Sequence, residues 1–146
     1  MRGKPAGAAQ SRIVASELRC YERVAGVRFI EQGYPHADPR SAAYRPADGG
    51  GQLRLRFNEP ECHDEELDEA AARAYIEALD AHGAFDLDRV YRPVQGSFSL
   101  SPQEWRLEVE FTANADGTVP EPYVAEGENA WPDGYEELVL SLQNSL

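Results

Sequence analysis

The sequence contains little cysteine, little lysine and no long apolar run. Its 146 residues include two cysteines, Cys20 and Cys62, and one lysine, Lys4. Two cysteines are too few for the disulfide framework of a small secreted domain, and a membrane span needs roughly 20 consecutive apolar residues. The start of the chain has basic residues without the apolar centre of a secretory signal. We therefore expect a cytoplasmic protein with reduced thiols, a flexible tail at residues 1–10 and a single α+β domain at residues 11–146.

Motifs that identify common catalytic sites are also missing. The sequence has no G-x-S-x-G elbow, no P-loop, no G-x-G-x-x-G and no H-E-x-x-H. Its glycine run, Gly49–Gly51, is expected in a hairpin loop, whereas a phosphate cradle opens a helix. We therefore expect no cofactor. The missing motifs favour a non-enzymatic protein but leave the question of an enzyme open.

Positive charge is scarce in the second part of the chain. The formal net charge is −12, which disfavours nucleic-acid binding because phosphate contacts need Lys and Arg. Residues 1–56 carry ten Arg or Lys against five Asp or Glu, whereas residues 57–146 carry four Arg against 21 Asp or Glu. Such asymmetry indicates an interaction surface. The alternative is that the two parts compensate each other within one fold.

Apolar residues recur at helical spacing in three segments. These are residues 9–25, a stretch from about Asp64 to Ala81, and the end of the chain. In the last segment the recurring residues are Trp131, Tyr135, Leu138, Val139 and Leu142. We predict a helix at residues 134–142, with a strand as the open alternative. In the middle segment, five carboxylates would fill the first helical turns, near the positive end of the helix dipole.

Other segments read as strands. Residues 104–111 alternate apolar and charged side chains, which is typical of an antiparallel strand with one wet face. Residues 41–57 read as a hairpin with a long glycine-rich loop. We therefore predict an α+β fold, in which a small antiparallel sheet of four to six strands carries an N-terminal helix, a central acidic helix and a C-terminal helix.

The run Glu61-Cys62-His63-Asp64 combines residue types that bind zinc. Adjacent residues on a chain point apart, and a structural zinc site usually needs a second, spaced pair of ligands, which the sequence lacks. For the same reason, a nucleophile formed by Cys62 and His63 is disfavoured. We therefore expect no metal site and no catalytic residue here.

Negative charge is densest in residues 59–80 and 116–137. The first segment has nine acids and one arginine, Arg73, and the second has seven acids and no basic residue. Aromatic side chains among acids can anchor a cationic partner, whereas a solubilising acidic coat is the alternative. The residues that we expect to bind a basic protein partner are Asp64, Glu65, Glu66, Asp68, Glu69, Glu126, Glu128, Trp131 and Tyr135.

In its size, negative charge and lack of catalytic motifs, the chain resembles the small acidic immunity proteins of bacterial toxin–immunity systems. The resemblance implies a non-enzymatic inhibitor that covers a basic toxin or another cationic protein. One alternative is a small-molecule-binding or enzymatic domain with a pocket between sheet and helices, using residues such as His36, Tyr44, Arg54, Arg56 or Tyr91. Another is an assembly subunit, in which the Arg54/Arg56 face of one copy meets an acidic face of the next. We expect no membrane partner, and the oligomeric state stays open.

Overall fold

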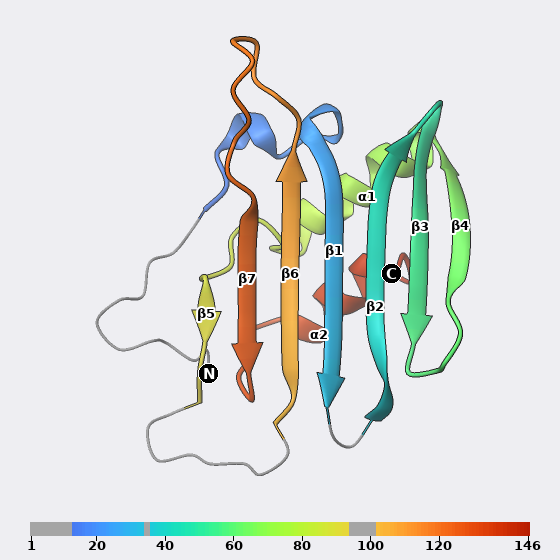
Figure 1. Ribbon diagram of the computed structural model, residues 1–146, viewed down its shortest axis with the longest axis vertical. Coiled ribbons are helices and arrows are strands. Elements are labelled where there is room, and N and C mark those ends of the chain that lie inside the picture. The colour runs from blue at the N-terminus through green and yellow to red at the C-terminus, as the bar shows by residue number, and fades with distance from the viewer. Residues whose placement is uncertain (1–12, 34–35, 94–101) are drawn as a thin grey trace.

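The computed structural model describes residues 13–33, 36–93 and 102–146, whose strands form one mixed sheet (Figure 1). The strands are β1 (Val24–Gly33), β2 (His36–Ala47), β3 (Gly50–Phe57), β4 (His63–Asp68), β5 (Val90–Tyr91), β6 (Glu104–Phe111) and β7 (Tyr123–Glu128). Their order across the sheet is β4-β3-β2-β1-β6-β7-β5. Neighbours are antiparallel except β5 and β7, which are parallel.

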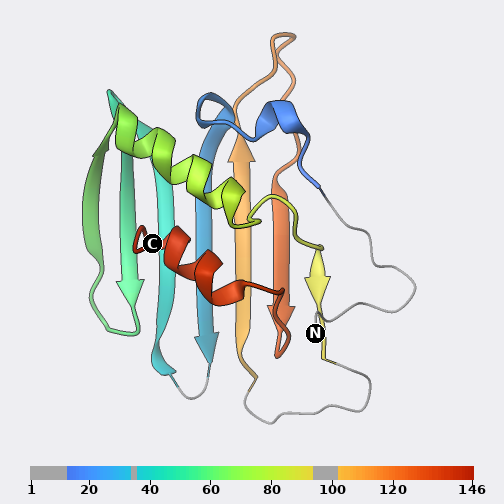
Figure 2. The same ribbon diagram turned by 180° about the vertical axis from the view of Figure 1, so that it is seen from behind.

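Two α-helices, α1 (Glu69–Ala81) and α2 (Tyr135–Leu142), lie on the same face of the sheet. Figure 2 shows both crossing this covered face, and Figure 1 shows that no described helix lies over the opposite, open face. The core lies between the sheet and the helices. From the helices it takes Ala72, Tyr75, Ile76, Leu79, Tyr135, Leu138, Val139 and Leu142.

Strand β6 shows how the sequence separates the two faces. Trp105, Leu107, Val109 and Phe111 are buried on the covered face, each 5% exposed or less. The charged residues that alternate with them lie on the open face, where Glu108 and Glu110 line a hollow. The alternation therefore predicted this strand and its orientation correctly.

The predicted N-terminal helix is wrong. Two short 3₁₀ turns, Ser16–Leu18 and Tyr21–Arg23, precede β1, which begins at Val24. Val14 is buried, and the side chains of Leu18 and Tyr21 pack against the core. Residues three apart also share a face in 3₁₀ turns, so the spacing identified the core contacts but not the local structure. Residues 1–12, including the predicted tail, lie outside the described part of the chain.

The predicted central acidic helix is also wrong. The acidic residues up to Asp68 form β4, which pairs with β3, and α1 begins at Glu69. The Asp68 side chain caps the helix by accepting a hydrogen bond from the backbone N–H of Ala71 at 2.8 Å. Because Asp64 and the two following glutamates precede the helix, its dipole does not explain them. Across residues 13–33, 36–93 and 102–146, the fold is therefore mostly a seven-stranded mixed sheet with two α-helices, not a smaller antiparallel sheet with three.

The ends of two predicted elements are now defined. The hairpin in residues 41–57 is present, but its turn is short, because β2 ends at Ala47 and β3 begins at Gly50. Gly49 in this turn has φ +78°, a left-handed conformation that glycine adopts readily. At the end of the chain, α2 confirms the C-terminal helix over the alternative strand.

Candidate functional site

The open face carries a hollow of about 680 Å³, which we call the groove. It lies over β1, β2 and β3, with β4 on one side and β6 on the other. The register aligns one row of side chains across it, namely Asp64, Arg54, Ala43, Arg28 and Glu108. The neighbouring positions are occupied by Glu66, Gln52, Arg45, Gly26 and Glu110.

The groove exists because its centre has small residues. Gly26 on β1 and Ala43 on β2 leave the strand backbone low between longer charged side chains. A Cβ atom at Gly26 would meet its nearest neighbours at 3.6 Å, which is ordinary contact. The hollow therefore has room for larger side chains at its floor, and the sequence leaves this space unfilled.

Charges in the groove are partly paired. Arg28 donates a hydrogen bond to Glu108 at 2.6 Å and lies 3.9 Å from Glu110. Arg54 donates to Asp64 at 3.1 Å on the other side. Arg45 is exposed and forms no ion pair with the described residues. Two arginines therefore lean towards the sides of the groove, and a third remains available to a ligand.

Five of the predicted partner-binding residues form an acidic edge. The acidic edge consists of Asp64, Glu65, Glu66, Asp68 and Glu69, all of them exposed. Asp64 and Glu66 face the groove from β4, one of the two edge strands of the described sheet. Glu65 accepts a hydrogen bond from the Asn144 side chain at 3.3 Å, and Glu69 lies 3.5 Å from Arg73.

The other four predicted residues lie elsewhere. Glu126 and Glu128 are on β7, near the opposite edge of the sheet, and Glu126 pairs with Arg106 at 3.4 Å. Trp131 is half-buried, and its ring centroid lies 6.4 Å from that of buried Tyr135. The structure thus brings the acids of residues 64–69 together but separates them from the aromatic residues, which pack with the core.

Sequence reasoning missed a buried polar cluster beside Tyr135. Glu31 is 5% exposed and accepts hydrogen bonds from Arg40 at 2.7 and 2.8 Å and from the Tyr135 hydroxyl at 2.5 Å. Burial, followed by the hydrogen bond to Glu31, raises the pKa of Tyr135. Arg40 also pairs with Glu136 at 2.9 Å. The cluster ties β1 and β2 to the start of α2, and no spacing in the sequence indicates contacts between residues so far apart.

Among the residues considered for a small-molecule site, those whose side chains are described do not meet in one place. Tyr44 and Tyr91 are buried, and the Tyr44 ring stacks on Tyr75 with centroids 5.3 Å apart. Arg54 lies on the other side of the sheet, in the groove. Arg56 donates to the backbone oxygen of Glu59 at 2.6 Å. The side chain of His36 lies outside the described part of the structure.

The cysteine–histidine run lies where β4 begins. Cys62 is exposed, and the Nε2 atom of His63 lies 2.6 Å from a carboxylate oxygen of Glu59. Within residues 13–33, 36–93 and 102–146, no group of three or more His, Cys, Asp or Glu side chains is placed to hold a metal ion. The run contributes the hydrogen bond between His63 and Glu59 and the ion pair between Asp64 and Arg54.

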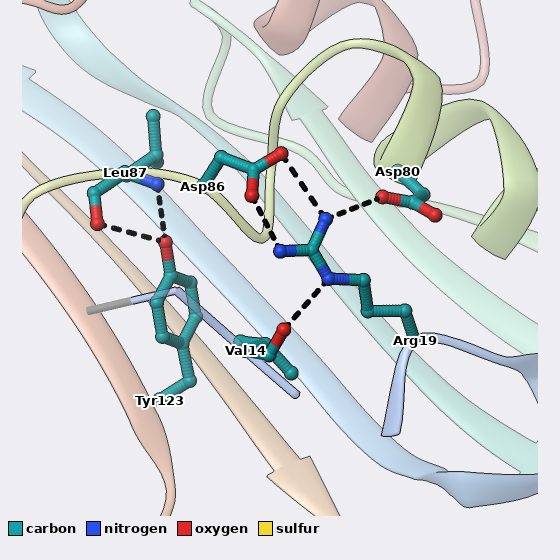
Figure 3. A network of polar contacts seen from close by, with 6 residues as sticks. All are labelled: Val14, Arg19, Asp80, Asp86, Leu87 and Tyr123. Atoms are coloured by element: carbon teal, nitrogen blue, oxygen red, sulfur yellow. Dashed lines mark hydrogen bonds and ion pairs between the residues drawn. The ribbon is translucent and has the colours of Figure 1, made fainter. Parts of the chain in front are cut away.

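A separate polar network fastens the start of the described chain to the end of α1 (Figure 3). Arg19 donates to the backbone oxygen of Val14 at 2.7 Å, to Asp80 at 3.2 Å and to Asp86 at 3.1 and 2.5 Å. Nearby, the Tyr123 hydroxyl contacts the backbone of Leu87. These partners are structural, since they hold the loop after α1 against the sheet.

Comparison with known proteins does not assign this site. No family model, curated protein or solved structure matches the chain. Neither described helix is long and apolar enough to cross a membrane. The function must therefore be inferred from the chemistry of the acidic edge and the groove.

Proposed function

We propose that this protein is a non-enzymatic inhibitor of a basic protein partner, such as a cytoplasmic immunity protein that covers a cationic toxin. The acidic edge supports the proposal. Of its five exposed carboxylates, Asp64 and Glu69 have an arginine within 4 Å among the described residues. The other three have no ion-pair partner there, so a cationic surface would find them available.

The position of the acids strengthens this interpretation. Strand β4 is outermost, so the backbone groups on its outer side pair with no other described strand. Such edges tend to join other strands, and charged side chains on them oppose pairing between identical copies. The same charges attract a basic surface and can raise its association rate by roughly 10–10³-fold. An acidic edge therefore disfavours self-association and favours a basic partner.

The experiment compares two variants that lose the same charge. The edge variant carries Glu65→Gln, Asp68→Asn and Glu69→Gln, in which Asn can still cap α1. The control variant carries Glu17→Gln, Asp133→Asn and Glu137→Gln, at exposed positions outside the acidic edge. Each protein is used to capture partners from a lysate of the source organism, and binding kinetics are measured on the purified partner.

We expect the edge variant to associate with the partner at least ten-fold more slowly than wild type at low salt. The difference should shrink towards 1 M salt, where the Debye length falls to about 3 Å. The control should remain close to wild type. Stoichiometric wild-type protein should also suppress the partner's activity. An acidic partner, or an edge variant with unchanged association rate and salt dependence, would contradict the proposal.

A further inference from the structure

We propose that the groove receives an α-helix of the basic partner, with basic side chains on both flanks of that helix. This inference rests on the proposed function and specifies how the partner would be recognised. The groove carries carboxylates on both sides, Asp64 and Glu66 from β4 and Glu108 and Glu110 from β6. A cationic segment lying along the strands would therefore meet negative charge on each flank.

The dimensions of the groove suit a helix. Strands β4 and β6 are four strand spacings apart, about 19 Å at roughly 4.8 Å per spacing. A helix with its side chains is about 10–12 Å across, which leaves room for lysine or arginine side chains to reach both sides. The small floor at Gly26 and Ala43 allows the helix to approach the sheet.

The spacing along the strands also matches. On each side the two carboxylates are two residues apart, about 6.7 Å along a strand. Helical residues four apart rise about 6.0 Å. Basic residues at positions i and i+4 on each flank would therefore lie beside successive carboxylates, an arrangement that a groove-bound helix can use for recognition.

The arginines of the groove determine which side chains the bound helix should carry between its two flanks. Arg28 and Arg54 already bind carboxylates at the sides, through pairs in which each arginine side chain is about two-thirds exposed. Such exposed pairs contribute only about 0–1 kcal/mol, so a partner's cation can share or replace them. Arg45 has no such pair among the described residues, and it would repel a uniformly basic ligand. The helix should therefore present an acidic residue between its two basic flanks.

The test uses two synthetic helical peptides of identical composition, about 18 residues long and held helical by a side-chain crosslink. The flank peptide has lysines at i and i+4 on both flanks, with glutamates between them. In the stripe peptide the lysines lie on one face. Binding is measured to wild type and to two groove variants, Glu66→Gln/Glu110→Gln and Ala43→Phe. The matched control, Glu104→Gln/Glu137→Gln, loses equal charge at exposed positions outside the groove.

We expect the flank peptide to bind wild type at least ten-fold more tightly than the stripe peptide. Both groove variants should weaken it at least ten-fold, and the control less than two-fold. Peptide addition to ¹⁵N-labelled wild type should shift the amide resonances of Gly26, Ala43 and Gln52, a readout that does not depend on the folding of any variant. Equal binding of the peptides, or shifts confined to β4 as in addition of a strand, would overturn the inference.

Binding of the captured partner to the edge variant and to the groove variants distinguishes a failure of this inference from a failure of the proposed function. If the edge variant slows association while Ala43→Phe and Glu66→Gln/Glu110→Gln leave affinity unchanged, the helix inference fails and the proposed function stands. If the edge variant has no effect on the partner, the proposed function fails, whatever the peptides do. If the edge variant and the groove variants all weaken binding of the partner, the result supports both the proposed function and the helix inference.

Discussion

Strand β1 carries two arginine–glutamate pairs that differ in their surroundings. On the covered face, Glu31 pairs with Arg40, and these side chains are 6% and 16% exposed. On the open face, Arg28 pairs with Glu108, and these side chains are 68% and 20% exposed. Removing one partner of a buried pair leaves the other charge buried and uncompensated. In an exposed pair, water and ions can take the place of the missing partner. The covered face therefore uses charge to hold the fold, and the open face keeps charge available for binding.

The largest expected effect comes from changing the charge on the two faces of strand β6. One variant adds a charge on the covered face, and the other removes a charge from the open face. Val109→Asp should abolish folding, because Val109 is fully buried and an unpaired carboxylate there has no compensating partner. Glu108→Gln on the open face should change the free energy of unfolding by about 0.5 kcal/mol or less. Thermal melts of the two variants provide the measurement. Similar melting behaviour would contradict the assignment of faces.

The two ion pairs can be compared directly. Glu31→Gln should lower the free energy of unfolding by about 3 kcal/mol, since it removes the buried carboxylate that Arg40 and Tyr135 bind. Arg40 keeps Glu136 as a partner, so unfolding need not be complete. Arg28→Gln should cost less than about 1 kcal/mol. Urea denaturation measures both, and equal losses would show that burial does not separate the pairs.

A smaller effect depends on pH. Burial raises the pKa of Tyr44 to about 12 from its ordinary value of 10. Because the folded state holds this proton more tightly, the stabilisation is complete below pH 10 and is lost as pH rises towards 12, a change of about 2 kcal/mol. Tyr44→Phe should be less sensitive across this window. The Tyr44 hydroxyl has no hydrogen-bond partner among the described residues, so the variant should be about as stable as wild type at pH 7.

Unfolding free energies of wild type and Tyr44→Phe at pH 9 and pH 11.5 give the comparison. Arg28→Gln serves as the control, since it changes an exposed side chain on the open face and leaves every tyrosine in place. An identical loss of stability in wild type and Tyr44→Phe would show that Tyr44 does not carry this part of the pH dependence.

The sequence was sufficient to predict an element where a local pattern of apolar residues determines it. Alternation in residues 104–111 predicted β6, and the helical spacing of Tyr135, Leu138 and Val139 predicted α2. It was insufficient at the acidic edge, whose charged residues have low strand propensity. Pairing with β3 overrides that propensity. Asp68 followed by an alanine-rich run was the available signal for the true helix start, because Asp is a favoured N-cap.

The candidate site was predicted only in part for a related reason. The sequence identified the acids of the edge, but the groove depends on register across five strands, which aligns Asp64, Arg54, Ala43, Arg28 and Glu108. The pairing of β1 with β6 joins residues about 80 positions apart, as Arg28 and Glu108 show. No local pattern specifies such a contact. Small residues such as Gly26 and Ala43 gain meaning only after the strands are placed.

The smallest expected difference separates two acids of the edge itself. Asp68→Ala removes the N-cap of α1 and should cost about 1 kcal/mol of stability. Asp64→Ala removes a pair in which both side chains are about two-thirds exposed, and should cost less than about 0.5 kcal/mol. Each variant deletes one carboxylate, so both should slow association with a basic partner by similar factors at low salt. Denaturation and binding kinetics on the same preparations test this, with Asp68→Asn as the variant that keeps a cap without the charge. If Asp68→Asn slowed binding as much as Asp68→Ala yet retained stability, charge would be the binding determinant. If only Asp68→Ala slowed binding, the determinant would be the position of α1, which the cap at residue 68 holds.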